Sequence, residues 1–444
     1  MKKQKIAVVG MGYVGIPAAA LLADVPGFDV TGIQRQSQRS GWKIEVLNSG
    51  HSPIEGNEPG LEELIARVVK KGTFRVTDDF SVLREMDTIL IDVQTPTDSA
   101  DHTPSYLSLK EVSRRVGEHM RTGALIIIES TVAPGTTQNV VQPILERKSG
   151  MKAGKDFYLA YSYERVMPGR LIEYIQNLPR IVGGINQKSE QLAVGLYKTI
   201  VREKIYSTDI LTAETSKTME NAYRDVNIAF ANEMALISEN LGVDVFEIQD
   251  LINSRSERHM HLPGSGVGGH CLPKDTWLLR YGLRRYGESP METEFISLAR
   301  RINDYMPQHM AEMVEGALKR KKVRIREAKV AILGVAYLED SDDTRNTPAY
   351  SLIRDLESKG AEVIAHDPHV REFPEVDLTK DLDVALEGAD CIAIVTKHRQ
   401  YFGLDLSKAR RLMRTAIIVD GRNVIDATRA EKQGFFYKGI GKGK

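Results

Sequence analysis

The chain has 444 residues, roughly three times a typical domain length, of which 42% are hydrophobic and 27% charged. This is an ordinary globular composition and predicts two or three domains. Lysine plus arginine and aspartate plus glutamate each number 60, so the formal net charge is zero, which argues against a nucleic-acid partner or an acidic membrane surface.

Cysteine content and the N-terminus bear on the compartment. Two cysteines, Cys271 and Cys391, are too few for a disulfide framework and favour a reducing environment. The apolar run from Ile6 to Val9 ends at Gly10, well short of the roughly 7 apolar residues that a signal peptide needs. No stretch approaches the roughly 20 apolar residues of a membrane span. We therefore expect a soluble, cytoplasmic protein with no membrane partner.

The first half of the chain alternates short apolar runs with amphipathic segments. This pattern is typical of a parallel sheet covered by helices on both faces. The intervening segments are long enough for right-handed helical crossovers. Residues 1–208 are thus predicted to form a Rossmann domain, with strands at Lys5–Val9, Val30–Ile33, Thr88–Val93, Ala124–Glu129 and Phe157–Tyr161.

A glycine motif directly follows the first predicted strand. Gly10, Gly12 and Gly15 form G-x-G-x-x-G around Tyr13 and Val14, and an apolar segment follows. In such a motif the first glycine permits a tight turn, the second lets the backbone approach a pyrophosphate, and the third permits close helix–strand packing. The motif predicts a dinucleotide at the N-terminus of the next helix.

The end of the second predicted strand departs from the usual pattern. Gln34 and Arg35 stand where an acidic residue usually binds the ribose hydroxyls. An amide also hydrogen-bonds a hydroxyl, whereas an arginine accommodates the 2′-phosphate of NADP. We interpret Gln34 as a tolerated variant and expect NAD as the cofactor.

A different pattern begins near Asp209. Residues 213–241 contain no proline or glycine, and Gly242 follows at a C-cap position. Apolar residues recur at steps of four, four and three, which places them on one face of a long helix: Val226, Phe230, Met234 and Ile237. We assign residues 209–320 to a central helical region.

After Arg320 the α/β alternation resumes over residues 321–444. The predicted elements are strands at Lys329–Gly334, Glu362–Ala365, Cys391–Val395 and Ala416–Val419 and a helix at Pro348–Lys359. This segment has no G-x-G-x-x-G. The fold class predicted for the whole chain is α/β, with two Rossmann-like domains joined by a central helical region.

The segment from Pro263 to Asp275 contains the candidate nucleophile. It is rich in glycine, which suits a backbone pressed against a ligand, and it places Cys271 directly after the glycines. A thiol adds to an aldehyde, and the adduct can be oxidised to a thioester and hydrolysed. On these residues alone, a buried structural cysteine is an equal alternative. His270 precedes the cysteine, but no second cluster has zinc-type spacing, so we expect no metal.

Two polar residues of the predicted long helix are also candidates. Lys217 and Asn221 are four residues apart and therefore share a helix face. A solvated stripe is the alternative interpretation of a lone lysine on such a helix.

Nine motifs then occur in order along nearly the whole chain. They are G-M-G-Y-V-G at 10–15, E-P-G-L at 58–61, T-P-T at 95–97, S-T-V-A-P-G-T at 130–136, Y-E-R-V-M-P-G-R at 163–170, K-T-M-E-N-A-Y-R at 217–224, G-V-G-G-H-C-L-P-K-D at 266–275, D-D-T-R-N-T-P at 342–348 and D-G-R at 420–422. This ordered set resembles the UDP-glucose/GDP-mannose dehydrogenase family. The resemblance implies an N-terminal NAD-binding domain, a central domain that dimerises through its long helix and holds the catalytic cysteine, and a C-terminal UDP-binding domain, in a homodimer or higher oligomer.

The resemblance also implies roles for single residues. Cys271 would be the nucleophile, Lys217 and Asn221 would contact the reacting oxygen, and Glu164 would be the general base of hydrolysis. The residues that position the water would be Thr131 and Asp275.

Binding contacts are implied as well. Cofactor contacts would come from Gly10, Gly12, Tyr13, Val14, Gly15, Gln34, Arg35, Thr95, Pro96, Thr131 and Arg345. Substrate contacts would come from Glu164, Arg165, Lys217, Asn221, Gly266, Gly268, Gly269 and Arg422, with Arg255 or Arg258 supplied by a neighbouring subunit. Leu338 stands where many members have a lysine, so one substrate contact is lost or moved.

The activity so implied is an NAD-dependent, four-electron oxidation of a nucleotide sugar at C6 through a Cys271 thiohemiacetal and thioester. His270 before Cys271 resembles members that oxidise UDP-N-acetylhexosamines. This favours UDP-N-acetyl-D-mannosamine oxidised to its uronate for cell-surface polysaccharide synthesis, ahead of UDP-N-acetylgalactosamine, UDP-N-acetylglucosamine and UDP-glucose.

Two other functions are remoter alternatives. A two-electron β-hydroxyacid dehydrogenase would need neither Cys271 nor the C-terminal nucleotide domain. A non-catalytic nucleotide-binding protein would not need to keep Lys217, Asn221, Glu164 and Cys271 together.

Overall fold

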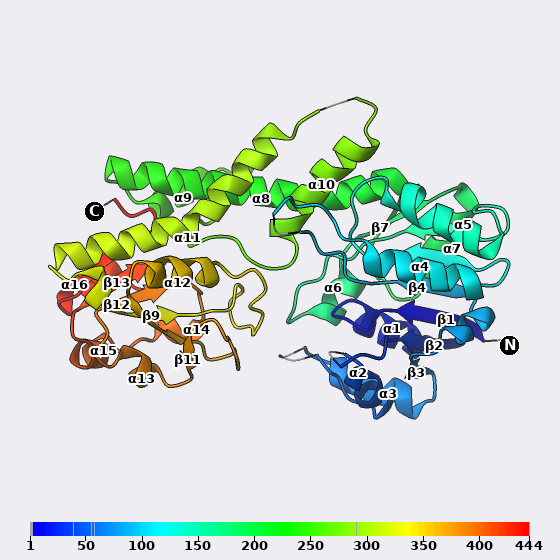
Figure 1. Ribbon diagram of the computed structural model, residues 1–444, viewed down its shortest axis with the longest axis horizontal. Helices are drawn as coiled ribbons and strands as arrows, with labels where there is room; N and C mark the ends of the chain where they lie inside the picture. Colours follow the sequence, from blue (N-terminus) through cyan, green and yellow to red (C-terminus); the bar gives the residue numbers. More distant parts are fainter. Residues whose placement is uncertain are drawn as a thin grey trace. The chain divides into compact units, whose positions relative to one another are not determined.

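The computed structural model describes residues 3–38, 40–54, 56, 58–98, 100–289 and 291–443. By their internal packing these residues divide into two compact units. Unit 1 comprises residues 1–220 and 277–292, and unit 2 comprises residues 221–276 and 293–444. One helix, α8 (Ile210–Leu241), begins in unit 1 and ends in unit 2 (Figure 1).

Unit 1 is built on an eight-stranded sheet in the order β3-β2-β1-β4-β5-β6-β7-β8. The strands are Gln4–Val9 (β1), Phe28–Ile33 (β2), Phe74–Thr77 (β3), Thr88–Ile91 (β4), Leu125–Ile128 (β5), Tyr158–Tyr161 (β6), Arg180–Gly184 (β7) and Ile205–Asp209 (β8). Strands β1 to β6 pair in parallel, and β7 pairs antiparallel with β6. The strand order reverses direction between β1 and β4, the position at which doubly wound sheets bind nucleotides.

Helices cover both faces of this sheet. They are Gly15–Asp24 (α1), Trp42–Asn48 (α2), Leu61–Lys70 (α3), Leu107–His119 (α4), Gln142–Ser149 (α5), Leu171–Asn177 (α6) and Gln187–Tyr197 (α7). Because strand residues alternate between faces, Ile6 and Val8 pack in the core under α1 and α3, while Ala7 and Val9 pack in the core under α4. The sheet therefore lies between two hydrophobic layers.

Unit 2 repeats this plan with a six-stranded sheet in the order β11-β10-β9-β12-β13-β14. Its strands, all parallel, are Lys329–Leu333 (β9), Glu362–His366 (β10), Asp377–Thr379 (β11), Cys391–Ile394 (β12), Ile417–Asp420 (β13) and Phe436–Gly439 (β14). Its helices include Val245–Asn253 (α9), Glu294–Arg320 (α11), Pro348–Ser358 (α12), Leu382–Leu386 (α13), Arg399–Phe402 (α14), Leu406–Leu412 (α15) and Ala427–Lys432 (α16). Helix α10 (Leu272–Tyr286) begins in unit 2 and ends in unit 1.

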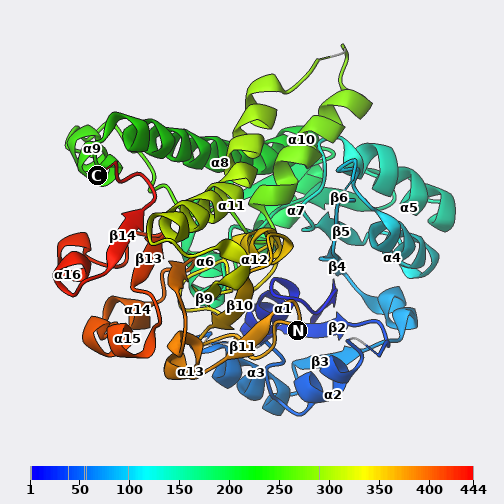
Figure 2. The same ribbon diagram turned by 60° about the vertical axis from the view of Figure 1, so that its left-hand side comes forward.

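Buried polar groups join α11 to α8 within unit 2, where the two helices lie side by side (Figures 1 and 2). Arg300 is 1% exposed and pairs with Asp225 at 2.6 Å. Asn232 donates to Asn303 at 2.8 Å. Burial raises the pKa of Asp225 to about 6, so the arginine offsets a charge that the core alone would disfavour.

The α/β fold with two Rossmann-like sheets, predicted from the sequence, is confirmed. Every predicted strand is present, with ends that differ by one or two residues, and the long helix begins at Ile210 rather than Ala213. Sequence reasoning missed β3, β7, β8, β11 and β14, which are short or carry charged residues, and α11, which contains Pro307. No helix within the described ranges is long and apolar enough to span a membrane.

Candidate active site

The glycine motif of unit 1 has the geometry of a dinucleotide loop. Gly10 has φ +110°, and a Cβ there would collide with the carbonyl oxygen of Asp92. A Cβ on Gly15 would collide with the carbonyl oxygen of Gly10. At Gly12, by contrast, no atom of the described residues lies within 4 Å of a Cβ. Packing therefore requires Gly10 and Gly15, while the open side of Gly12 fits the approach of a cofactor pyrophosphate at the start of α1.

Gln34 braces this loop from the end of β2. Its Oε1 accepts a hydrogen bond from the Met11 backbone N–H at 3.1 Å, and its Nε2 donates to Ser40 Oγ at 2.9 Å. Lys43 Nζ donates to the Met11 carbonyl at 3.2 Å, and burial lowers the pKa of this lysine. Arg35 is exposed. The glutamine that replaces the usual acid thus has a structural task in the loop.

Loops that follow β4 and β5 are tied together at the same sheet edge. Thr95 Oγ1 donates to the Thr131 carbonyl at 2.6 Å. Ser130 Oγ donates to the Val93 carbonyl at 2.8 Å. These bonds hold Thr131, the predicted water-positioning residue, beside the Thr95–Pro96 segment predicted to contact the cofactor.

Glu164, the predicted general base, lies beyond β6 in a buried ionic network. Its carboxylate accepts a hydrogen bond from the Arg180 guanidinium. Arg180 also donates to Glu129 at 2.5 Å. The backbone carbonyl of Glu164 accepts a bond from Lys217 Nζ at 2.9 Å, so two of the predicted catalytic residues are in contact.

Sequence reasoning missed Arg180 and Glu129. Both are charged residues at the boundary of apolar strands, Glu129 just after β5 and Arg180 at the first position of β7, and both are at most 4% exposed. A charge at the end of an otherwise apolar run was the available signal, because fully buried charges are almost always paired.

Asp92 is a further carboxyl group at this edge, in a half-buried residue. Burial, followed by the nearby charges of Glu129 and Glu164, raises the pKa of Asp92 to about 8. The raised pKa favours the neutral form of Asp92, which reduces negative charge beneath the site where the pyrophosphate would bind.

In unit 2, Cys271 is exposed and directly precedes α10. Its carbonyl accepts hydrogen bonds from the backbone N–H groups of Asp275 at 2.8 Å and Lys274 at 3.0 Å, which form the first turn of the helix. A helix N-terminus favours negative charge and hence a thiolate. Cys391, in contrast, is buried in β12, and burial raises the pKa of its thiol. Of the two cysteines, Cys271 has the environment of a nucleophile.

Asp275 links the cysteine helix to α8. Its carboxylate is fully buried, accepts a hydrogen bond from Asn221 Nδ2 at 2.5 Å and pairs with Lys274 at 3.1 Å. His270 directly precedes the cysteine in the sequence. Burial, together with the charges of Lys274 and Arg345, lowers the pKa of its imidazole to about 4. The histidine is therefore neutral at physiological pH.

Packing within unit 2 gives the glycines before Cys271 a second purpose. A Cβ on Gly269 would lie 2.7 Å from the Tyr337 ring, and one on Gly268 would lie 2.8 Å from the Asn346 carbonyl oxygen. The Gly269 N–H donates to the Arg345 carbonyl at 2.8 Å. The sequence suggested that these glycines make room for a ligand, and the structure shows that they also make room for the loop around Arg345.

Four of the arginines predicted to contact ligands make hydrogen bonds or ion pairs with residues of their own unit. Arg422 donates to the carbonyls of Val395 at 2.8 Å and Gly266 at 3.1 Å, and burial lowers its pKa to about 10. Three others pair with carboxylates: Arg345 with Asp343 at 2.5 Å, Arg165 with Glu220 at 3.0 Å and Arg255 with Glu257 at 3.1 Å. Arg258 is exposed in the turn after α9. Their ligand contacts stay predictions.

A cavity of about 590 Å³ adjoins the cysteine loop in unit 2. Its walls come from the cysteine loop, α11, the start of α12 and residues 372–375, and include Val267, Pro273, Asp304, Asn346 and Tyr350. This volume is in the range of small-molecule sites.

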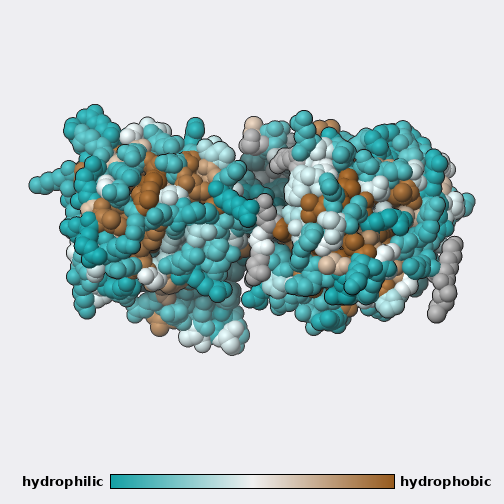
Figure 3. Space-filling model, turned by 90° about the horizontal axis from the view of Figure 1, so that it is seen from below, coloured by the Kyte–Doolittle hydropathy of each residue, from teal (hydrophilic) through white to brown (hydrophobic). Residues whose placement is uncertain are grey.

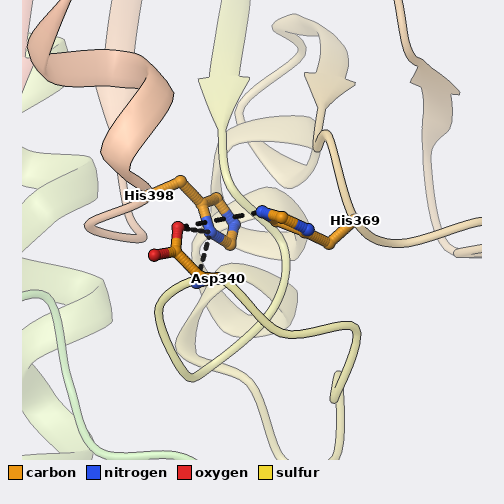
Figure 4. A group of neighbouring side chains, drawn as sticks. All are labelled: Asp340, His369 and His398. Atoms are coloured by element: carbon orange, nitrogen blue, oxygen red, sulfur yellow. Dashed lines mark hydrogen bonds and ion pairs between the residues drawn. The ribbon is translucent and has the colours of Figure 1, made fainter. Parts of the chain in front are cut away.

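Among the described residues, Asp340, His369 and His398 form a group with metal-ligand chemistry (Figure 4). Both ring nitrogens of His398 are already engaged, since Nδ1 accepts from the Asp340 N–H at 2.9 Å and Nε2 bonds to Asp367 at 3.0 Å. The carboxylate of Asp340 accepts bonds from Arg399. We assign this group to holding the loop at Asp340 rather than to binding a metal.

Three family profiles match the chain in succession. They describe the NAD binding domain of the UDP-glucose/GDP-mannose dehydrogenase family over residues 4–201, its central domain over residues 211–305 and its UDP binding domain over residues 331–427. The two Rossmann-like sheets thus coincide with the NAD and UDP binding domains of the family.

Individual relatives match over the whole length. The UDP-N-acetyl-D-mannosamine dehydrogenase of Pyrococcus horikoshii is 40% identical over 99% of both chains. A crystal structure of an NDP-N-acetyl-D-galactosaminuronic acid dehydrogenase from Methanosarcina mazei is 42% identical, covers 100% of this chain and 96% of its own, and superposes with a TM-score of 0.89. The structure of a UDP-D-ManNAc dehydrogenase from Pyrococcus horikoshii superposes with a TM-score of 0.91 at 40% identity over 99% of this chain and 100% of its own.

The glycine geometry predicts different outcomes at two positions of the loop. Gly12→Val should fold normally, because its side chain meets open space, but should weaken NAD binding about tenfold or more. Gly15→Val should lower the melting temperature, because its side chain meets the Gly10 carbonyl. Calorimetric titration with NAD and thermal unfolding separate these effects, with Gly195→Val, on open helix surface, as the control. Unchanged NAD affinity in Gly12→Val would show that the pyrophosphate does not approach there.

Proposed function

The chain belongs to the UDP-glucose/GDP-mannose dehydrogenase family, and we propose that it oxidises C6 of UDP-N-acetyl-D-mannosamine to the uronic acid for polysaccharide synthesis. The observation that carries this proposal is the end-to-end match to UDP-N-acetyl-D-mannosamine dehydrogenases, which extends over 99% of the chain at 40% identity. Cys271 at the start of α10, with Asn221 and Asp275 beside it, supplies chemistry suited to that reaction.

A UDP-linked N-acetylgalactosamine is the second candidate substrate. The observation that favours it is the 42% identity to the galactosaminuronic acid dehydrogenase of Methanosarcina mazei. The two sugars differ in the configuration of ring carbons, so the same reaction at C6 serves both. Only the contacts to the sugar ring would differ.

NAD, bound by the loop from Gly10 to Gly15, would accept a hydride from C6 in each of two oxidations. In the first, C6 changes from alcohol to aldehyde, and the hydroxyl proton is lost. The Cys271 thiolate then adds to the aldehyde carbon and forms an S–C bond. The resulting oxyanion would be stabilised by the charge of Lys217 and by a hydrogen bond from Asn221. Protonation of the oxyanion gives the thiohemiacetal.

In the second oxidation the thiohemiacetal carbon loses a hydride and its hydroxyl group loses a proton to solvent, which gives a thioester on Cys271. Water attacks the thioester carbon, Glu164 takes a proton from that water, and the Cys271 thiolate leaves with the electrons of the S–C bond. Thr131 and Asp275 would position the water. Because the thiol must stay reduced to act again, we place the enzyme in the reducing cytoplasm.

Self-association through α8 is part of the proposal. Four apolar side chains at steps of seven, seven and four residues are 44–71% exposed on one side of this helix: Tyr223, Phe230, Ile237 and Leu241. Hydrophilic residues cover most of the face seen in Figure 3, with hydrophobic residues in scattered groups. Exposed apolar side chains that recur on one side of a helix are instead typical of a helix that packs against a partner. We propose a second copy of this chain as the partner, with Arg255 or Arg258 reaching its substrate.

The substrate proposal is tested by initial rates of NADH formation. UDP-N-acetyl-D-mannosamine should give a kcat/KM at least about tenfold above those of UDP-N-acetylgalactosamine, UDP-N-acetylglucosamine, UDP-glucose and GDP-mannose. Preference for the galactosamine derivative would select the second candidate. A preference for UDP-glucose or GDP-mannose would contradict both.

The covalent mechanism is tested at Cys271 and Glu164. Cys271→Ala should still bind NAD and the nucleotide sugar but lose at least about 1,000-fold in uronate formation, because the aldehyde is not trapped. Glu164→Gln should accumulate the thioester, visible as a substrate-sized mass increase on the intact protein. Cys391→Ala, in the buried strand, serves as the thiol control. Uronate production by Cys271→Ala at near wild-type rates would refute the covalent step.

The proposed α8 interface is tested by introducing a charge at its exposed apolar positions. Phe230→Glu and Ile237→Glu should each shift the protein towards monomer, because a carboxylate buried at an apolar interface is unpaired. Sedimentation velocity gives the oligomeric state. Val384→Glu, at an exposed apolar position on α13, is the control and should leave the sedimentation coefficient unchanged. Wild-type protein that sediments as a monomer at all concentrations would overturn the proposal.

A further inference from the structure

Arg180, in unit 1, is a buried arginine that pairs with two glutamates. The Arg180 side chain is 3% exposed and lies between Glu129, whose side chain is fully buried, and Glu164, whose side chain is 9% exposed. Burying a charge costs several kcal/mol unless it is paired, so the burial of Arg180 depends on its two glutamate partners. No step of the proposed reaction uses Arg180 or Glu129 directly.

Every nitrogen of the guanidinium has a partner that fixes its orientation. One terminal nitrogen donates to Glu164, the other to Glu129 at 2.5 Å, and Nε donates to Ser162 Oγ at 2.8 Å. The guanidinium carbon lies 3.6 Å from the centroid of the Tyr197 ring, which closes one flat side. The planar fork is thereby held in one position.

Glu129 anchors the arginine from the opposite side. Its Oε1 accepts both the Arg180 bond and a bond from the Tyr197 hydroxyl at 2.7 Å. Burial raises the pKa of Glu129, and Arg180 opposes that rise. The arginine is thus held by Glu129 and Tyr197 as well as by Glu164.

Among the residues that the structure describes, five titratable or charged groups face Glu164 from the surrounding elements. They are Arg180 of β7, Glu129 after β5, Asp92 after β4, Tyr197 of α7 and Lys217 of α8. Lys217 bonds to the Glu164 backbone carbonyl rather than to its carboxylate. Arg180, in contrast, contacts the carboxylate itself, so replacing it with a neutral residue would leave that carboxylate among acidic groups.

We propose that Arg180, anchored by Glu129 and Tyr197, is a positioning residue that holds the Glu164 carboxylate in place for hydrolysis of the Cys271 thioester. This inference rests on the proposed role of Glu164 as general base. Arg180 places its positive charge against the Glu164 carboxylate through one terminal nitrogen, so removal of that charge should change the pH dependence of the hydrolytic step.

The test is the pH dependence of thioester hydrolysis, measured by quenching turnover and determining the intact mass of the protein. Arg180→Gln should shift the half-maximal pH of hydrolysis upward by about one unit or more. At neutral pH this variant should accumulate the acyl-enzyme, and raising the pH should release it. Glu164→Gln should accumulate the acyl-enzyme at every pH, because the base itself is gone.

A conservative variant and a control variant separate the proposed role of Arg180 from a loss of folding. Arg180→Lys retains the charge but not the fork, so it should fold and shift the midpoint less than Arg180→Gln. Arg114→Gln removes an exposed arginine that also lies between two glutamates, on α4, and should leave the profile unchanged. If Glu164→Gln accumulates the adduct but both Arg180 variants hydrolyse it with the wild-type pH profile, the inference is wrong. If Glu164→Gln accumulates none, the proposed role of Glu164 fails instead.

Discussion

Parallel pairing of the central strands in unit 1 is the constraint on which the candidate site depends. Val9 of β1 aligns with Ile33 of β2 and with Ile91 of β4, and the alignment continues through Ile128 of β5 to Tyr161 of β6. All five strands therefore end at the same level. The residues that follow them form a row along one sheet edge: Gly10, Gln34, Asp92, Glu129 and Ser162. If the register of any strand pair shifted by one residue, the residue that follows the shifted strand would point to the opposite face of the sheet.

The sequence was sufficient to predict what periodicity and local chemistry determine. The strands of both sheets, the long helix and the glycine loop follow from apolar runs and from the backbone requirements of Gly10 and Gly15. Helix α11 was missed because Pro307 interrupts its pattern, although the proline is tolerated where the helix packs against the glycine loop of unit 2. Strands β3 and β11 were missed because each is short and carries a charged residue, Arg75 in β3 and Asp377 in β11, so neither shows as an apolar run.

Long-range charge pairing is the part that the sequence could not provide. Glu129 and Arg180 are 51 residues apart, as are many unrelated pairs, and nothing local indicates that they meet. The same holds for Asp225 and Arg300, which stabilise the packing of α8 against α11. A buried charge is recognised only once the fold places its partner. Sequence reasoning therefore found the residues of the proposed chemistry, Cys271, Lys217 and Glu164, but not the residues that hold them.

The contrasting environments of the two cysteines have a consequence for oxidative damage. Cys391 is sealed within β12, whereas Cys271 is exposed at the start of α10. Peroxide and electrophiles react with accessible thiolates, so modification should concentrate on Cys271. Cys391 is buried, and the sequence has no third cysteine that could form a protective disulfide with Cys271. Loss of activity under oxidative stress would therefore report the chemical state of one sulfur atom, and reversal by a thiol would distinguish sulfenic acid from the irreversible sulfinic and sulfonic acids.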